Sequence, residues 1–262
     1  MREQRLVFGE VAELYDRARA AYSEAVIDDV LRFAGGDGSR LRALEVGAGT
    51  GKATVAFAVR GLAIVAIEPS AAMAAVARRN CKPFPNVRLE CTTFEDWAVE
   101  ANPFDLVFSA QAWHWVTPEV RYVKAAEALA GGGTLALFWH RTRWQGEDLR
   151  AELEDLYRRL VPELYAKDPG FPGLTQPRGD DRLVDEIKGS GLFGEPTMHD
   201  HPWSVTFTAD SFVELLLTQS DHRLLPEDTR AELFEAVRSI VTAHGGEVVV
   251  PHTTLLALAR RR

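Results

Sequence analysis

The chain has 262 residues, of which 46% are hydrophobic and 26% are charged. This composition is ordinary for a globular protein, and the length suits one large α/β domain better than two small ones. The formal net charge of −8 argues against a nucleic-acid-binding protein, in which a basic stripe is usual.

The expected compartment follows from cysteine usage and from the apolar segments. The two cysteines, Cys81 and Cys91, lack the spacing of metal ligands, which favours a reducing compartment. The N-terminal sequence MREQRLVFGE has no apolar signal-peptide core, and no apolar run is long enough to span a membrane. We therefore expect a cytoplasmic protein, monomeric or homodimeric, with neither nucleic acid nor membrane as a partner.

The first predicted elements precede a glycine-rich loop. Residues 8–33 read as two amphipathic helical pieces, followed by a loop at 35–39 and a strand at Leu41–Val46. The sequence LEVGAGTGKA then places Gly47, Gly49 and Gly51 at alternate positions after Glu45, before a helix predicted at Lys52–Val59. Such glycines mark a tight turn between a strand and a helix N-terminus, where a ligand contacts bare backbone. The stretch predicts a nucleotide-like ligand.

Two interpretations of this loop compete. In the dinucleotide fingerprint G-x-G-x-x-G, the third glycine would stand where this chain has Lys52. Glu45 has no role in holding a pyrophosphate, but it suits a ligand with a cationic end and no phosphate. S-adenosylmethionine is such a ligand, and E-V-G-A-G-T-G resembles the first motif of the class I S-adenosylmethionine-dependent methyltransferases, E/D-x-G-x-G-x-G.

The second strand is predicted at Ala63–Ile67, a continuous apolar run typical of a buried parallel strand. It ends at Glu68, and Pro69 and Ser70 begin a helix that reaches Arg79. An acid at this strand tip is placed to accept hydrogen bonds from both hydroxyls of a ribose. The alternative is a helix-start charge that the helix dipole favours.

The third strand is predicted at Val87–Cys91, and the turn at residues 92–97 follows it. The resemblance implies that this turn holds the adenine, with Phe94 on the ring and Glu95 or Asp96 accepting from the exocyclic amine. Either acid equally suits a cap of the next helix.

A fourth strand at Phe104–Ser109 leads into an aromatic loop, AQAWHWV, at residues 110–116. Ligands of open α/β sheets lie at the carboxyl ends of the strands, so the methyl acceptor is expected here. Gln111 and Trp113 would line the cofactor, while Trp113, His114 and Trp115 would form the acceptor pocket. His114 is a candidate general base, and the alternative is that it only binds backbone.

A helix at Pro118–Ala130, a glycine stop at 131–133 and a fifth strand at Thr134–Trp139 complete the alternation. Further on, we expect helices at 147–165, 182–188, 210–218 and 226–244, a loop at 169–179 and a strand at 203–208. Strands at 248–250 and 253–259 would form a final antiparallel hairpin. These elements predict a doubly wound, mostly parallel, seven-stranded α/β sheet. It would be a single domain over residues 1–262, with a core at about 35–142 plus the C-terminal strands, and lid insertions at about 147–180 and 210–245.

The resemblance also covers the segment before the first strand, where the family has the form YDxxRPxYP. Matching residues are Tyr15, Asp16, Arg19 and Tyr22, whereas Ala20 and Ser23 replace the two prolines. Tyr15 and Arg19 are therefore candidates to cover the cofactor; the alternative is a helix pair that merely packs on the sheet.

Two polar clusters carry less weight. His199 and His201 alternate on a possible strand, but no acid or cysteine stands nearby in the sequence at metal-ligand spacing, so we expect no metal site. Ser220, Asp221 and His222 are too close in sequence for triad geometry, although His222 is a candidate to contact the acceptor.

Taken together, the motifs resemble most closely the small-molecule methyltransferases that act on carboxylic acids such as trans-aconitate. We expect S-adenosylmethionine as cofactor and a small carboxylate or hydroxyl compound as methyl acceptor. An NAD(P)-dependent oxidoreductase and a non-catalytic S-adenosylmethionine-binding protein are the alternatives. The expected cofactor-binding residues are Tyr15, Arg19, Glu45, Gly47, Ala48, Gly49, Gly51, Glu68, Pro69, Phe94, Glu95, Gln111 and Trp113.

Overall fold

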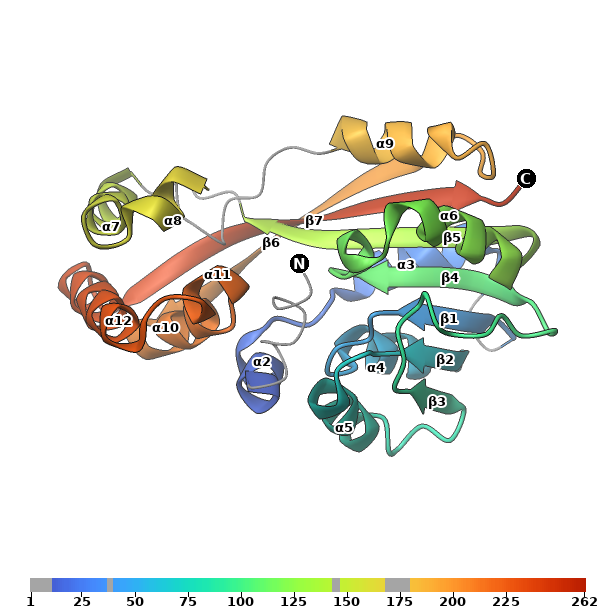
Figure 1. Cartoon of the computed structure of the whole chain (residues 1–262), viewed down its shortest axis with the longest axis horizontal. Helices are drawn as coiled ribbons and strands as arrows, with labels where there is room; N and C mark the ends of the chain where they lie inside the picture. The colour runs from blue at the N-terminus through green and yellow to red at the C-terminus, as the bar shows by residue number, and fades with distance from the viewer. Residues whose placement is uncertain (1–10, 37–39, 143–146, 168–179) are drawn as a thin grey trace. The chain divides into compact units, whose positions relative to one another are not determined.

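The computed structural model of the chain describes residues 11–36, 40–142, 147–167 and 180–262 (Figure 1). Part of the loop expected at 35–39 and all of the loop expected at 169–179 lie outside these ranges. Contacts divide the chain into two compact units. The sheet unit comprises the described residues within 20–139, 178–201 and 254–262. The helical unit comprises the described residues within 1–19, 140–177 and 202–253.

The strands form one seven-stranded sheet in the order β3-β2-β1-β4-β5-β7-β6. They are β1 (Arg42–Val46), β2 (Ala63–Ile67), β3 (Val87–Glu90), β4 (Phe104–Ala110), β5 (Leu129–Thr142), β6 (Thr197–Thr208) and β7 (Glu247–Arg260). Strands β1 to β5 pair in parallel, whereas Arg261 directly after β7 donates its backbone N–H to Gly133 near the start of β5. Strand β7 therefore runs antiparallel, and the predicted doubly wound, mostly parallel sheet is confirmed.

Helices cover both faces of the sheet unit. They are α3 (Glu24–Ala34), α4 (Lys52–Ala58), α5 (Ala71–Asn80), the short 3-10 helix η2 (Trp113–Trp115), α6 (Pro118–Ala128) and α9 (Asp180–Gly189). Apolar residues of α3 and α4, such as Val30 and Phe57, pack on one face of the strands. Residues of α6 and α9, such as Tyr122 and Ile187, pack on the other. Burial on both faces explains why the central strands are continuous apolar runs.

The helical unit has a hydrophobic core of its own. Its helices are α2 (Ala12–Ala18), α7 (Glu147–Leu160), α8 (Pro162–Lys167), α10 (Ala209–Leu217), α11 (Ser220–Arg223) and α12 (Glu227–Ala243). Leu153, Phe212, Leu233 and Val237 meet in this core and are fully buried. The expectation that these helices act as a lid stays a prediction.

Several predicted boundaries were wrong for local physical reasons. The helix expected at 147–165 is interrupted before Pro162, which lacks the N–H needed to continue it. The glycines at 131–133 lie inside β5 and do not follow a helix, because the chain is already extended at Leu129. The expected terminal hairpin is one strand, β7, that continues through Pro251, since the φ of about −65° that proline imposes is still compatible with extended backbone.

Candidate functional site

The carboxyl ends of β1, β2 and β4 meet at one edge of the sheet unit, because parallel neighbours end on the same side. Backbone hydrogen bonds fix the glycine loop there. The N–H groups of Gly47 and Ala48 both donate to the carbonyl of Ile67, at 2.9 Å each. The hydroxyl of Ser109 donates to the carbonyl of Val46 at 2.7 Å. The loop is therefore tied to both neighbouring strands.

Each glycine of the loop has a positive φ, and each has a different reason to lack a side chain. A Cβ on Gly47 would lie 2.3 Å from the Cβ of Ala112, so the loops after β1 and β4 are in contact. A Cβ on Gly51 would lie 3.3 Å from Ala77 and from the sulfur of Cys81, where α4 starts against α5. A Cβ on Gly49 would meet no described atom within 4 Å. Gly49 thus exposes bare backbone at the place where a ligand is expected.

Glu68 joins this loop to the end of β2. Its carboxylate accepts one hydrogen bond from the N–H of Gly49 at 2.9 Å and another from the N–H of Ser70 at 2.8 Å. Burial raises the pKa of this carboxyl, and the hydrogen bonds from Ser70 and Gly49 oppose that rise. A carboxylate oxygen has two lone-pair sites, so each oxygen keeps one for a further donor such as a ribose hydroxyl. Pro69, the next residue, is exposed.

Glu45 lies beneath the loop and is fully buried. One carboxyl oxygen accepts a hydrogen bond from the hydroxyl of Thr54 at 2.5 Å, while the other has no hydrogen-bond partner among the described residues. Burial raises the pKa of Glu45 to about 8, with the Thr54 hydrogen bond opposing the rise and the charge of Glu68 adding to it. Direct contact with a ligand would require the loop to open.

The turn after β3 is largely engaged within the protein. Phe94 is buried and packs near Trp97 and Trp113, with ring centroids 6.3 and 6.1 Å away. Glu95 accepts from both the N–H and the hydroxyl of Thr117, the residue before α6, at 2.9 and 2.8 Å. Glu95 is thus tied to the residue that precedes the first turn of α6, and the adenine contact stays a prediction.

The loop after β4 carries a strained residue. Gln111 has a φ of 62°, the sole positive φ among the described residues that are not glycine. Such a conformation is held only where the surroundings impose it, and it is frequent at ligand sites. Here the N–H of Gln111 donates to the carbonyl of Phe138 at 2.9 Å, which extends the β4–β5 pairing by one residue.

The aromatic residues of this loop divide between the core and the surface. Trp113 is 1% exposed and packs edge-to-face on Tyr122, whose pKa is raised to about 12, chiefly by burial. His114 is exposed and its Nδ1 accepts a hydrogen bond from the indole N–H of Trp139 at 3.4 Å. This bond favours the tautomer with the proton on Nε2, which would make Nε2 a hydrogen-bond donor. Trp115 is half-buried beside the His114 ring.

The other predicted site residues belong to the helical unit. Arg19 donates to the hydroxyl of Thr218 at 2.7 Å, and its guanidinium lies 5.2 Å from the ring centroid of Tyr15. His222 is fully buried, bonded through Nε2 to the hydroxyl of Tyr157 at 2.6 Å. Burial, with the charge of Arg19 adding to it, lowers the pKa of His222 to about 3, so the ring is neutral at physiological pH.

Sequence reasoning did not anticipate three polar groups of the sheet unit. Thr54, Ser109 and Asn80 hold the loop region, the last by donating its side-chain amide to the carbonyl of Thr50 at 2.9 Å. The packing of α4 and α5 reveals Thr54 and Asn80, and the pairing of β4 with β1 reveals Ser109, because no sequence motif links any of the three to the glycines. The hydroxyl of Thr50, inside the loop, is buried without a hydrogen-bond partner among the described residues.

Comparison with known proteins agrees with this geometry. The family described as "Methyltransferase domain" matches residues 43–133, which include the glycine loop, Glu68 and the loop after β4. An uncharacterized methyltransferase of Mycobacterium tuberculosis is 29% identical over 93% of this chain and 88% of its own length. A demethylmenaquinone methyltransferase of Tropheryma whipplei is 30% identical over 71% of this chain and 80% of its own length.

A solved structure shares the fold. It is a phosphoethanolamine N-methyltransferase of Haemonchus contortus, solved with phosphomonomethylethanolamine and S-adenosylhomocysteine, which superposes with a TM-score of 0.56 at 16% identity. The match covers 97% of this chain and 57% of that one. The shared fold, the sequence relatives and the glycine loop beside Glu68 all indicate the same family. The chain belongs to the class I S-adenosylmethionine-dependent methyltransferases.

Proposed function

We propose that this methyltransferase transfers the methyl group to a small-molecule acceptor bound beside the loop after β4. The observation that carries the proposal is the contact between the two loops, where a Cβ on Gly47 would lie 2.3 Å from that of Ala112. This contact supports the proposal because Gln111 and His114 belong to the loop that meets the glycine loop at Ala112. The net charge of −8 also disfavours a nucleic-acid acceptor.

The names of two similar proteins support a small acceptor. The structural neighbour from Haemonchus contortus holds phosphomonomethylethanolamine, and the relative from Tropheryma whipplei is named for demethylmenaquinone. Because one is an amine and the other a quinone, they support a small acceptor without favouring one chemical group. The carboxylate acceptor that the sequence suggests stays part of this proposal.

Residues of the sheet unit would hold the cofactor as follows. The open backbone at Gly49 would accommodate it, Glu68 would accept hydrogen bonds from its ribose hydroxyls, and Gln111 would border it. When bound, S-adenosylmethionine supplies an electrophilic methyl group on a sulfonium. The protein's contribution would be to orient the acceptor and to exclude water from it.

His114 would act on the acceptor. With Nδ1 accepting from Trp139, the favoured tautomer carries its proton on Nε2, which suits orientation of a carboxylate acceptor. A carboxylate needs no base to react, whereas a hydroxyl or amine acceptor would need His114 to adopt the other tautomer, release the Trp139 bond and take up a proton on Nε2. The role of His114 therefore depends on the class of acceptor.

The test is formation of S-adenosylhomocysteine, measured by mass spectrometry, with separate panels of small carboxylates, phenols and amines, and with bulk tRNA and protein. We expect turnover in a small-molecule panel alone. With a carboxylate acceptor, His114→Ala should raise KM more than it lowers kcat; with a phenol or amine, kcat should fall by about 10²-fold or more. Turnover confined to tRNA or protein would contradict the proposal.

A further inference from the structure

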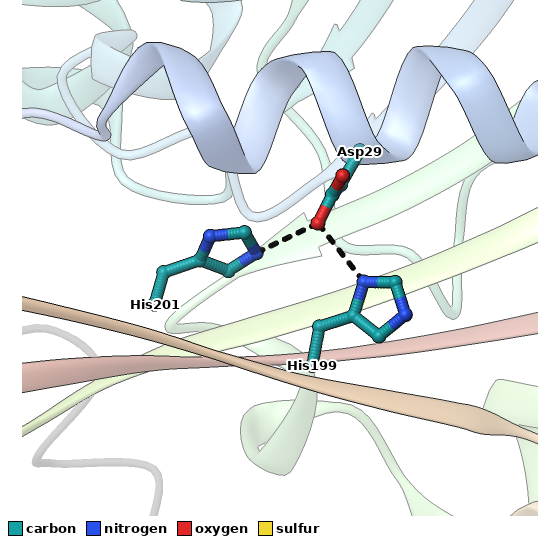
Figure 2. A group of neighbouring side chains, drawn as sticks. All are labelled: Asp29, His199 and His201. Atoms are coloured by element: carbon teal, nitrogen blue, oxygen red, sulfur yellow. Dashed lines mark hydrogen bonds and ion pairs between the residues drawn. The ribbon is translucent and has the colours of Figure 1, made fainter.

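A second group of polar side chains lies away from the glycine loop, on helix α3 and the edge strand β6. His199 and His201 occupy alternate positions of β6, so both side chains point to the same face of the sheet. Asp29, on α3, faces them, as Figure 2 shows. Asp200 stands between the two histidines in the sequence, but alternation along the strand turns it to the opposite face, so the acid that meets them comes from a distant part of the chain.

The three side chains converge on one oxygen. Oδ2 of Asp29 lies 2.9 Å from Nδ1 of His199 and 3.1 Å from Nε2 of His201 (Figure 2). One potential ligand atom from each residue lies within 4.8 Å of the others. Around a tetrahedral zinc ion with bonds of about 2.0–2.1 Å, ligand atoms are about 3.3–3.4 Å apart. Small rotations of the side chains would therefore produce ligand geometry.

Hydrogen bonding alone leaves this group incompletely satisfied. Nδ1 of His199 is hydrogen-bonded to Asp29, but Nε2 of His201 is buried and makes no hydrogen bond with any described residue, despite its short distance to Oδ2. The ring nitrogen lies close to a carboxylate oxygen, but no N–H is aligned to form a hydrogen bond between them. A buried nitrogen without a hydrogen bond lowers the stability of the folded state. A cation between the three atoms would satisfy them all.

We propose that Asp29, His199 and His201 form a binding site for one divalent transition-metal ion of the zinc type. Two imidazoles and one carboxylate are ligands that such ions prefer over magnesium or calcium, which favour oxygen alone. Three protein ligands leave a fourth position for water. The site is accessible, since the side chain of His199 is 39% exposed.

One neighbouring cation competes with the metal. Arg32 forms an ion pair with the other carboxylate oxygen of Asp29, and its side chain is 72% exposed. A metal bound to Oδ2 of Asp29 leaves Oδ1 for the ion pair with Arg32. The exposed guanidinium can also turn toward water. The competing charge lowers the affinity of the site without blocking any of the three ligand atoms.

The consequence of metal binding would be structural. Val30 and Leu31 of α3 pack in the apolar core on one face of the sheet, and β6 is the edge strand. An ion shared by α3 and β6 would fasten the edge of the sheet to that helix. Because the ligand set exists only in the folded chain, the ion would stabilise the folded state, by an amount that grows with the logarithm of its free concentration once that exceeds Kd.

The test is calorimetric titration of tag-free protein with zinc chloride, together with thermal melting at increasing zinc. The variants are His199→Ala, His201→Ala and Asp29→Asn. The matched control is His244→Ala, because His244 lies 3.1 Å from Glu152 as a histidine–carboxylate pair that lacks a second histidine. Melting without zinc shows that each variant is folded, and the exposed His199 is the substitution that disturbs packing least.

We expect wild type and the control to bind one zinc ion per chain, with a melting temperature that rises with zinc. Each ligand variant should bind at least about 10- to 100-fold more weakly, which is the loss that removing a partner outside the ligand set already causes, and it should lose the rise. Absence of saturable binding by wild type would overturn the proposal. So would equal binding by wild type, His199→Ala and Asp29→Asn, because the ion would then be held by other residues.

Discussion

The buried carboxyl of Glu45 ties the ligand site to the stability of the fold. Its pKa of about 8 in the folded protein, against an ordinary value of 4.5, arises first from burial. Between pH 4.5 and about 8, the folded chain therefore keeps a proton on Glu45 that the unfolded chain has released. By linkage, the resulting contribution to stability is complete below the unfolded pKa and is lost as pH rises through the folded one.

Glu45→Gln should remove this dependence, because the amide is neutral at every pH and still accepts from Thr54. The free energy of unfolding of the variant minus that of wild type should grow between pH 4.5 and 8 and then level off. The growth should be a few kcal/mol, at about 1.4 kcal/mol per pKa unit. Denaturant titrations at several pH values measure it, with Glu127→Gln, on the exposed side of α6, as control. A difference that stays flat across this range would show that Glu45 is not buried as a neutral acid.

The two glycines Gly49 and Gly35 separate ligand binding from backbone strain. Both have positive φ, 59° and 88°, and a Cβ on either would meet no described atom within 4 Å. Alanine at either position should therefore cost a similar free energy of unfolding, about 1–2 kcal/mol, for the left-handed conformation. Only Gly49→Ala should also abolish binding of S-adenosylmethionine, because its methyl group would occupy the open side of the loop. Equal affinities of the two variants in calorimetry would refute this role of Gly49.

At the residue scale, the sequence predicted the residues that a glycine motif brings with it. Gly47, Gly49 and Glu68 were expected together, and the structure places them in one hydrogen-bonded region. The acid that meets His199 and His201 was not expected, because Asp29 lies 170 residues from His199 in the chain. Short-range spacing identifies contacts within a strand–loop–helix unit, whereas contacts between distant elements depend on topology.

At the scale of elements, a buried hydrogen bond joins two helices of the helical unit. Tyr157 of α7 is bonded to Nε2 of His222 in α11, and the imidazole stacks on Phe234 of α12 with ring centroids 5.7 Å apart. The Nδ1 atom of His222 is buried and has no hydrogen-bond partner among the described residues. The Tyr157 hydroxyl is therefore the polar contact that orients the ring.

Tyr157→Phe should destabilise the protein by about 1–3 kcal/mol, because it leaves a second buried nitrogen of His222 without a partner. Tyr165→Phe is the matched control, since that hydroxyl accepts a surface hydrogen bond from Arg158 at 3.1 Å. The control should change stability by less than about 0.5 kcal/mol, as surface substitutions usually do. Chemical denaturation measures both, and equal losses would contradict a special role for the buried bond.

The sequence predicted the type and order of the elements better than their ends. The strand expected at 203–208 is β6 from Thr197 to Thr208 and includes Pro202. An edge strand tolerates proline because one of its sides has no neighbouring strand, so a missing N–H on that side costs no hydrogen bond of the sheet. The sequence pattern placed His199 and His201 only on a possible strand, and the structure shows that this segment and the strand expected at 203–208 are one element. The ends of β6 are set by its pairing with β7, and a local sequence pattern contains no information about that pairing.

At the scale of the whole molecule, the chain combines a mostly parallel sheet with a set of helices that has its own core. No helix of the described ranges combines the length and apolar character needed to cross a bilayer. The methyltransferase assignment comes from the strand–loop–helix units at residues 43–133, which carry the cofactor motifs. The acceptor could not be predicted in the same way, because acceptor recognition has no comparable motif in the sequence.

The central claim is that the glycine loop and Glu68 bind S-adenosylmethionine and not a dinucleotide. Calorimetric titration of wild type, Glu68→Ala and the exposed-residue control Glu127→Ala with S-adenosylmethionine, S-adenosylhomocysteine and NADH tests it most directly. We expect wild type and control to bind the first two ligands and not NADH. Glu68→Ala should bind them at least about 10-fold more weakly, since hydrogen bonds to a charged group contribute roughly 1.5–3 kcal/mol each. Binding of NADH alone, or unchanged affinity in Glu68→Ala, would contradict the account.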